Sequence, residues 1–325
     1  MKVLVTGGAG FIGMHVAIKL LESGNEVIVI DNMNDYYSVE LKEARLKQLQ
    51  KFKNFKFIRG DISDKITINK LFETELPTKV VNLAAQASVR YSFINPDAYI
   101  KSNLVGFANI LEACRNYPVE KLVYASSSSV YGLNKKVPFS ELDEVNTPTS
   151  LYAATKRSNE LLAFTYRHLY GIKAIGLRYF TVYGPWGRPD MAPWLFTKAM
   201  TEQKKIKVFN NGEMSRDFTY IDDIVDGTLS VLNAGTDFEG GPNNFSDQIF
   251  NIGGHNPIKL MDFIGALEKK LNIVSLKDYL PMQPGEVIST YADISKISSV
   301  YNFVPQISIE QGISKWVDWY KSNNY

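Results

Sequence analysis

The sequence has little of several residue types that define special classes of protein. Cys114 is the only cysteine among 325 residues, so an internal disulfide is excluded and a reducing compartment is favoured. Cys114 lies in an apolar stretch and is interpreted as a small buried residue. The three histidines, His15, His168 and His255, lie too far apart to predict a zinc site. Uninterrupted apolar runs stay well short of the roughly 18 residues that a membrane-spanning helix needs.

The chain also lacks an excess of charge of either sign. Lys plus Arg number 36 and Asp plus Glu number 34, giving a formal net charge of +2, which argues against a nucleic-acid groove as the main function. Hydrophobic residues make up 45% and charged residues 22%, as in ordinary globular proteins. At about 150 residues per domain, the length predicts two domains, or one large domain with an appended lobe. The first apolar run breaks at Thr6, unlike a signal peptide, so a soluble cytoplasmic protein is expected.

Short apolar runs alternate with longer amphipathic stretches through the first half of the chain. The runs lack the polar alternation of half-exposed strands, which indicates parallel strands covered on both faces. We therefore expect an α/β fold with a Rossmann-type, doubly wound parallel sheet. The expected strands are 2–6, 27–30, 55–58, 80–85 and 122–125, and the expected helices are 11–23, 41–49, 66–75, 97–115 and 309–320.

The alternation of strand-like and helix-like segments becomes less regular after about residue 180. Proline and glycine cluster at 184–193 and again at 235–247, and such clusters interrupt helices and strands. We expect a dinucleotide-binding domain over 1–180, to which segments at about 215–255 return. A smaller C-terminal α/β substrate lobe is expected mainly over 181–325.

Glycines spaced three apart follow the first expected strand and open the first expected helix. Gly7, Gly10 and Gly13 permit a tight turn, a close approach of the backbone to a pyrophosphate, and close packing of the helix on the sheet. The helix N-terminus offers unpaired N–H groups to phosphates. Asp31 ends the second strand, where a carboxylate accepts hydrogen bonds from a ribose diol and repels a 2′-phosphate, so NAD is favoured over NADP. The alternative is a tight turn and an ordinary surface aspartate.

Two further strand ends are candidates for the cofactor site. Asp61 and Ile62 follow the third strand, where an adenine ring would rest. A helix N-cap at Asp61 or Ser63 is the equally weighted alternative. Leu83, Ala84, Ala85 and Gln86 end the fourth strand, and their mostly small side chains leave room for a cofactor.

An acid–base pair is expected at Tyr152 and Lys156. Four residues apart on a helix, the two side chains share one face, and the charge of lysine, like that of an oxidised nicotinamide, favours phenolate. A phenolate of lowered pKa is a plausible base for a sugar hydroxyl. Thr149 or Ser150 would cap this helix. The same spacing, which is common by chance, occurs outside convincing helices at Tyr117/Lys121 and Tyr131/Lys135.

A serine run, Ser126 to Ser129, ends the fifth strand and would face the ligand crevice, or would simply begin a polar loop. The glycine loop, Asp31, the serine run and the Tyr152 pair occur together in this chain. In this combination the chain resembles the extended short-chain dehydrogenase/reductase superfamily of nucleotide-sugar epimerases and dehydratases. Within that superfamily the chain is most similar to the UDP-glucuronate 4-epimerases. The segments that carry the resemblance cover 31–37, 84–92, 124–133, 178–191 and 216–223.

The resemblance implies roles for individual residues. Ser127, Tyr152 and Lys156 would be catalytic, and Arg216 would hold the UDP diphosphate. The stretch 194–198 and Val208-Phe209 would surround the uridine. NAD would also contact Phe11, Ile12, Asn32 and Tyr179, and the UDP-sugar would contact Arg90, Ser127, Ser128, Ser129, Thr181, Arg188, Val208, Phe209 and Arg216. A homodimer through helix 97–115 and the Tyr152 helix, and a place in polysaccharide synthesis, are implied as well.

The implied reaction converts UDP-glucuronic acid to UDP-galacturonic acid through a 4-keto sugar. That intermediate is a β-keto acid, so Ser128, Ser129, Thr181 and Arg188 would hold its carboxylate against decarboxylation. Dehydratases and decarboxylating relatives carry acidic residues where this chain has Ser128 and Ser129, so neither reaction is expected. The alternatives are a 4-epimerase of UDP-glucose or UDP-N-acetylglucosamine and a cofactor-sensing regulator without chemistry. Ser88 replaces a common glycine, and Gln283 replaces an arginine that in many relatives contacts the diphosphate.

Overall fold

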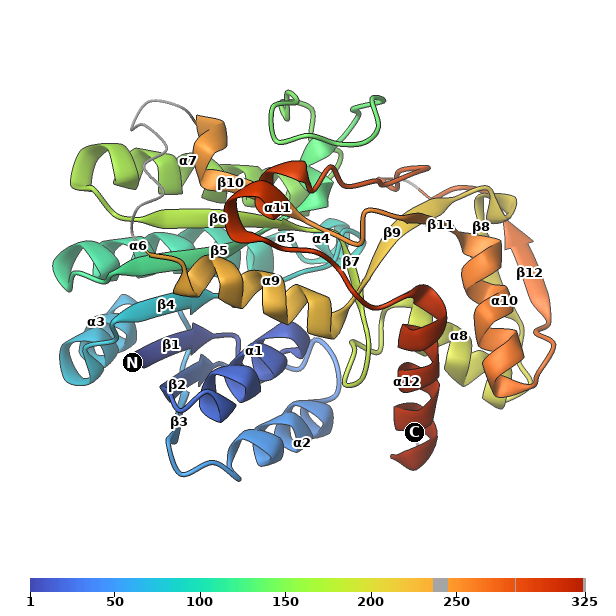
Figure 1. The fold of residues 1–325 in the computed structure, drawn as a ribbon, viewed down its shortest axis with the longest axis horizontal. Helices are drawn as coiled ribbons and strands as arrows, with labels where there is room; N and C mark the ends of the chain where they lie inside the picture. Colours follow the sequence, from blue (N-terminus) through green and yellow to red (C-terminus); the bar gives the residue numbers. More distant parts are fainter. Residues whose placement is uncertain (236–244, 284, 324–325) are drawn as a thin grey trace.

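The predicted doubly wound sheet is confirmed by a computed structural model, which describes residues 1–235, 245–283 and 285–323. Within these residues, seven strands form one parallel sheet in the order β10-β6-β5-β4-β1-β2-β3 (Figure 1). Apart from the edge strand β3, which is only partly buried, its strands are buried and mostly rich in Val, Leu and Ile, as expected for a sheet covered on both faces. Their bounds are Lys2–Thr6 (β1), Glu26–Asp31 (β2), Phe55–Arg59 (β3), Lys79–Asn82 (β4), Lys121–Ser127 (β5), Ala174–Tyr179 (β6) and Ile249–Ile252 (β10).

Two helical layers cover the sheet (Figure 1). One face carries α1 (Phe11–Glu22), α2 (Val39–Leu49) and α9 (Ile221–Asn233), with α11 (Ser295–Tyr301) packed against α9 and β10. The other carries α3 (Lys65–Glu75), α6 (Gly106–Asn116) and α7 (Leu151–Tyr170), and short α4 (Tyr91–Ile94) and α5 (Pro96–Tyr99) precede α6. Each layer encloses its own apolar core, so the strands are buried from both sides.

Two expectations are corrected in detail, and two strands were missed. The helix expected over 97–115 contains a π-helical stretch, Ile100–Val105, between α5 and α6. It aims Asn103 inward, where its side chain bonds the backbone N–H of Gln86 (2.8 Å) and the Thr155 hydroxyl (3.0 Å). The fourth strand ends at Asn82 rather than 85, because the next residues leave the sheet to line a cavity. Strands β6 and β10 were not predicted.

A smaller lobe lies beyond the carboxyl ends of the sheet strands (Figure 1). It contains a three-stranded sheet, ordered β11-β9-β7, and a parallel pair, β12 and β8. The chain returns to the large sheet through α9 and β10, which interleaves the two parts. The bounds are Thr181–Tyr183 (β7), Ile206–Phe209 (β8), Ser215–Tyr220 (β9), Pro257–Lys259 (β11), Lys277–Leu280 (β12), Ala192–Thr201 (α8), Leu260–Leu271 (α10) and Ile309–Ser322 (α12). Of the second expected loop region, 236–244 lie outside the described residues.

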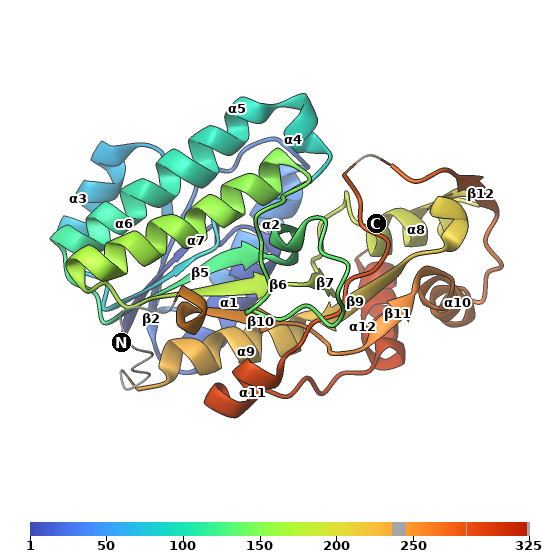
Figure 2. The same cartoon turned by 90° about the horizontal axis from the view of Figure 1, so that it is seen from above.

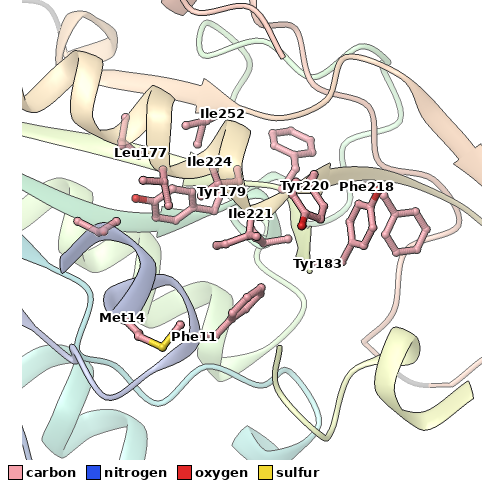
Figure 3. Packing of buried hydrophobic residues seen from close by; sticks show 14 of the residues in the cluster. Phe11, Met14, Leu177, Tyr179, Tyr183, Phe218, Tyr220, Ile221, Ile224 and Ile252 are labelled. Carbon is pink, nitrogen blue, oxygen red and sulfur yellow. The ribbon is translucent and has the colours of Figure 1, made fainter. Parts of the chain in front are cut away.

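An aromatic cluster joins the core of the large domain to that of the smaller lobe. Tyr183, Phe218 and Tyr220 lie together beside Ile221 at the start of α9, and Phe11 approaches from α1 (Figure 3). The rings of Phe218 and Tyr183 meet edge to face, with centroids 6.0 Å apart. This continuous core holds the smaller lobe against the strand ends. No helix among the described residues is long and apolar enough to cross a membrane.

Candidate active site

The carboxyl ends of the parallel strands open onto a cavity of about 950 Å³, whose other walls come from the smaller lobe. This volume lies at the upper end of small-molecule sites. The predicted cofactor-binding residues all line it: Gly7, Gly10, Phe11, Ile12, Gly13, Asp31, Asn32, Asp61, Ile62, Leu83, Ala84, Ala85, Gln86, Tyr152, Lys156 and Tyr179. The predicted substrate residues that line it are Arg90, Ser127, Ser128, Ser129, Thr181, Arg188, Phe209 and Arg216.

The glycine loop has the geometry of a phosphate cradle. Gly7 adopts a φ of 69°, and its carbonyl accepts the N–H of Gly10 at 3.0 Å. A Cβ on Gly13 would lie 2.3 Å from the carbonyl oxygen of Gly7, so only glycine lets α1 start this close to the loop. Among the described residues, no side chain caps the N-terminus of α1. Its N–H groups and partial positive charge are therefore available to an anion.

Acidic side chains hold the loops beside this cradle. Asp31 accepts the backbone N–H of Ala9 (3.1 Å) and of Met33 (2.9 Å). Asp61 accepts the N–H of Ser63 (2.9 Å) and the amide of Asn32 (3.2 Å). Burial alone would raise the pKa of Asp61, but these hydrogen bonds hold it below its ordinary value. The N-cap considered for Asp61 or Ser63 belongs instead to Asp64, which caps α3.

Tyr152, Lys156 and the serine run line the same cavity. Ser150 caps α7 by accepting the N–H of Ala153, so Tyr152 lies in the first helical turn. Ser127, at the end of β5, lies close enough to the Tyr152 hydroxyl to favour its ionised form. Lys156 is fixed by its bond to the carbonyl of Ala125, at 2.8 Å. The side chains predicted to be catalytic are therefore together.

Burial, however, dominates the acid–base properties of the pair. It raises the pKa of Tyr152 above its ordinary value, while Ser127 and the charge of Arg188 act to lower it. Burial also lowers the pKa of Lys156 to about 8. The lowered tyrosine pKa expected from Lys156 is therefore not found in the protein alone, because desolvation disfavours both charged forms.

The serines of the run make two different sets of contacts. Ser127 and Ser129 are hydrogen-bonded to each other (3.1 Å), and Ser128 and Ser129 begin a short 3₁₀ turn that lines the cavity. Ser126 instead donates to Glu160 at 2.6 Å, and that carboxylate also binds the buried Arg178. Sequence reasoning missed Glu160, although its position one turn after Lys156 on the same helix is a usable signal.

Cationic side chains line the cavity from the smaller lobe and from the loop after β4. Arg90 and Arg216 both bind Glu286, at 2.5 and 3.4 Å, and the Arg90 guanidinium lies over the Phe209 ring at 4.9 Å. Gln283 also lines this region, and Pro284 lies outside the described residues. Glu286 was missed, because no local pattern links it to arginines so distant in sequence.

Two residues expected around a uridine face elsewhere. Val208 does not line the cavity, because its fully buried side chain points into the core of the smaller lobe. Its neighbour Phe209 does line it, as expected where successive strand residues point to opposite faces. Trp194 packs against Trp316, with ring centroids 5.6 Å apart, instead of facing the cavity, and Leu195 and Phe196 line it in its place.

Comparisons with known proteins agree with this geometry. The sequence model of the GDP-mannose 4,6 dehydratase family matches residues 4–316. Protein CapI of Staphylococcus aureus is 50% identical over 98% of each chain. UDP-glucuronate 4-epimerase 4 of Arabidopsis thaliana is 46% identical over 99% of this chain and 76% of its own.

A solved structure gives the same result. UDP-glucuronic acid 4-epimerase from Bacillus cereus, in complex with UDP-glucuronic acid and NAD, superimposes with a TM-score of 0.91 at 36% identity, covering 99% of this chain and 100% of its own. UDP-glucose 4-epimerase from Thermotoga maritima has a TM-score of 0.89 at 32% identity, with both chains covered completely. The chain therefore belongs to the GDP-mannose 4,6 dehydratase family, among the relatives that include the UDP-glucuronate 4-epimerases.

Proposed function

We propose that the chain is an NAD-dependent isomerase that converts UDP-glucuronic acid to UDP-galacturonic acid through a transient 4-keto sugar. The observation that carries the proposal is that Ser127, Tyr152 and Lys156 line one cavity together with the glycine loop, Arg90 and Arg216. The relatives named UDP-glucuronate 4-epimerases, and the Bacillus cereus complex, support the choice of sugar.

The residues of the cradle fit NAD. The uncapped start of α1 and the close approach enforced by Gly13 suit a pyrophosphate, and Asp31 suits a ribose diol. When bound, NAD accepts a hydride from C4 of the sugar and returns it to the opposite face. Because the cofactor would be restored in each turnover, we expect it to remain bound to the protein.

Tyr152 has the position and chemistry of the acid–base group. In our proposal its hydroxyl takes the proton from the sugar O4 as the C4–O double bond forms, and returns it when the ketone is reduced. Ser127 orients this hydroxyl, and Lys156, tethered to Ala125, supplies a positive charge that favours the phenolate. Because burial raises the pKa of Tyr152, the protein relies on the charges of bound ligands to bring it into the working range.

Uronate chemistry adds a second requirement. The 4-ketone is β to the C6 carboxylate, so the C5–C6 bond breaks readily if it aligns with the carbonyl π-system. Ser128, Ser129 and Thr181 offer neutral hydroxyl donors for that carboxylate, and Arg188 offers a guanidinium. Neither Ser128 nor Ser129 can act as the acid–base group that dehydration requires at neutral pH.

The proposal is tested by incubating the purified protein with UDP-glucuronic acid, without added NAD, and separating the products by chromatography. UDP-glucose and UDP-N-acetylglucosamine are run in parallel. We expect UDP-galacturonic acid with little pentose product. Turnover of a neutral sugar alone would replace the substrate while keeping the Tyr152 mechanism. Failure with all three sugars, even after NAD is added, would contradict the proposed activity.

We also propose a homodimer through the helices beside the site. Ile100 and Val105 lie in the π-helical stretch before α6, Leu161 lies on the adjacent α7, and all three are more than 40% exposed. The helices lie side by side in Figure 2. Other apolar residues of α6 already cover the sheet, so these three need a different partner. Light scattering should give twice the chain mass, and Leu161→Lys should weaken the dimer, whereas Leu133→Lys, at an exposed loop position, should not.

A further inference from the structure

Tyr36, in the loop after β2, contacts a segment of the smaller lobe. Its hydroxyl donates to Oδ2 of Asp190 at 2.9 Å, although the two residues are 154 positions apart in sequence. Asp190 in turn binds Arg188 through two bonds, from Nε (3.0 Å) and Nη2 (2.6 Å). The Arg188 guanidinium lies 6.0 Å from the centre of the Tyr36 ring. Tyr36, Asp190 and Arg188 therefore form one chain of contacts.

The same loop holds the backbone of that segment through a second connection. Arg45 on α2 is fully buried and donates to the Tyr37 hydroxyl at 2.7 Å. Its other terminal nitrogen donates to the carbonyls of Trp186 (2.7 Å) and Gly187 (3.2 Å). The backbone on the N-terminal side of Arg188 is thus anchored to the dinucleotide-binding half of the molecule. The guanidinium beyond it is oriented by Asp190.

Arg188 lies close enough to the reacting centre for its charge to lower the pKa of Tyr152. Burial alone would raise the pKa of Asp190, but Arg188 and the bond from Tyr36 hold it below its ordinary value, so the aspartate is ionised. Its charge largely balances that of Arg188. The pair therefore attracts an anion weakly by net charge. Its ability to bind a carboxylate depends on where the N–H groups of Arg188 that Asp190 leaves free are directed.

We propose that Tyr36 is a positioning residue that, through Asp190, fixes Arg188 on the C6 carboxylate of the 4-keto uronate and so suppresses decarboxylation. This inference rests on the proposed function. In the side reaction the C5–C6 bond breaks, carbon dioxide leaves, and the electron pair passes into the C4 carbonyl as an enolate, which takes a proton from water at C5. A carboxylate held with the C5–C6 bond in the carbonyl plane cannot donate that pair.

The test compares the products that Tyr36→Phe and wild-type protein form from UDP-glucuronic acid. The variant keeps the ring and removes the hydroxyl, which bonds Asp190 and also interacts with Ser88. We expect the fraction of decarboxylated product, UDP-4-keto-pentose or its reduced form, to rise about tenfold, because a charge-assisted hydrogen bond of ordinary strength is lost. The epimerisation kcat should change by less than about threefold, since Tyr152 is untouched. Binding of UDP-glucose, which lacks the carboxylate, should be unchanged in calorimetry.

Tyr91→Phe is the matched control. Its ring packs on Tyr36 at 4.5 Å, but its hydroxyl accepts from Asn95 and does not reach Asp190. The control should keep the wild-type product ratio. Asp190→Asn should raise the decarboxylated fraction, and adding Tyr36→Phe to it should raise the fraction no further, because both changes act on one contact.

The outcomes separate the two proposals. If wild-type protein makes no UDP-galacturonic acid, the proposed function fails, and this inference fails with it. If the wild type is active and Tyr36→Phe keeps its product ratio, only this inference is overturned. Equal changes in Tyr36→Phe and Tyr91→Phe, or additive effects of Tyr36→Phe and Asp190→Asn, would also overturn it, because they would indicate a general loosening of the loop.

Discussion

The carboxylate of Glu160 and the guanidinium of Arg178 form a buried ion pair one helical turn from Lys156, a member of the proposed acid–base pair. The two bonds measure 2.8 and 3.0 Å, and both side chains are almost completely removed from solvent. Glu160 also accepts the hydroxyl of Ser126, so the pair connects the end of β5, β6 and α7. Lys156 lies one helical turn before Glu160, and the ion pair therefore supports α7 where it packs on β5 and β6.

Glu160→Gln should destabilise the protein by about 3–5 kcal/mol, because it leaves the charge of Arg178 buried without a counter-ion. Urea denaturation measures the loss. Glu202→Gln removes an exposed partner of Lys204 and should leave the unfolding midpoint unchanged. Equal stability of the Glu160→Gln variant and the wild type would show that water or Tyr131, whose ring lies 4.8 Å from Arg178, compensates the charge.

Gly13→Ala should remove cofactor binding while leaving the fold intact. The added Cβ would meet the backbone of Gly7 and Gly8, and no flexible side chain is present there to move aside. The loop and the start of α1 would have to separate, which spoils the phosphate cradle. NAD released from denatured protein, quantified by chromatography, should fall from near one per chain to a small fraction.

The matched glycine variant for that experiment is Gly265→Ala on α10. A Cβ there meets nothing within 4 Å, and helix propensity favours alanine by about 0.5–1 kcal/mol. Its NAD content should equal that of the wild type. A Gly13→Ala variant that retains full NAD would disprove the assignment of this loop as the cradle.

Tyr152→Phe should lower kcat for epimerisation by about 10²–10⁴-fold, the usual contribution of a positioned acid–base group. The ring remains, so NAD content and thermal stability should be retained, and both serve as controls for folding. Product formation from UDP-glucuronic acid under saturating conditions is the measurement. Activity within tenfold of wild type would assign proton transfer to another group, with Ser127 the first to examine.

The parts of the site that could be predicted from sequence are local along the chain. The glycine loop joins one strand to one helix, so Gly7, Gly10, Gly13 and the expected strand and helix define its geometry together. The Tyr152 pair is defined within a single helix by its spacing and by the cap at Ser150. In both cases a short segment contains the whole structural feature.

The parts that could not be predicted depend on contacts between distant segments or on burial. Nothing in the local pattern around Tyr36 indicates that it meets Asp190. Val208 and Phe209 are adjacent apolar residues, and only the packing of β8 decides which of them faces the cavity. The raised pKa of Tyr152 likewise follows from desolvation, which the helical spacing of Tyr152 and Lys156 does not reveal.

His15, on the helix that follows the glycine loop, should make the protein sensitive to acid. Burial lowers its pKa from 6.5 to about 4, although the bond to the carbonyl of Phe11 opposes the shift. Between these values the unfolded chain binds a proton that the folded protein does not, so stability is lost as the pH falls from 6.5 towards 4. From pH 7 to 4.5 this linkage removes about 2 kcal/mol.

His15→Gln removes the titrating group, so its free energy of unfolding should fall less than that of the wild type over this pH range, by about the same 2 kcal/mol. Urea denaturation at pH 7 and 4.5 gives the two differences. His168→Gln, at an exposed position near the end of α7, should lose as much stability as the wild type. Equal acid sensitivity of the wild type and His15→Gln would mean that the folded protein accommodates a charged His15, because any cost of burying that charge would otherwise appear in the comparison.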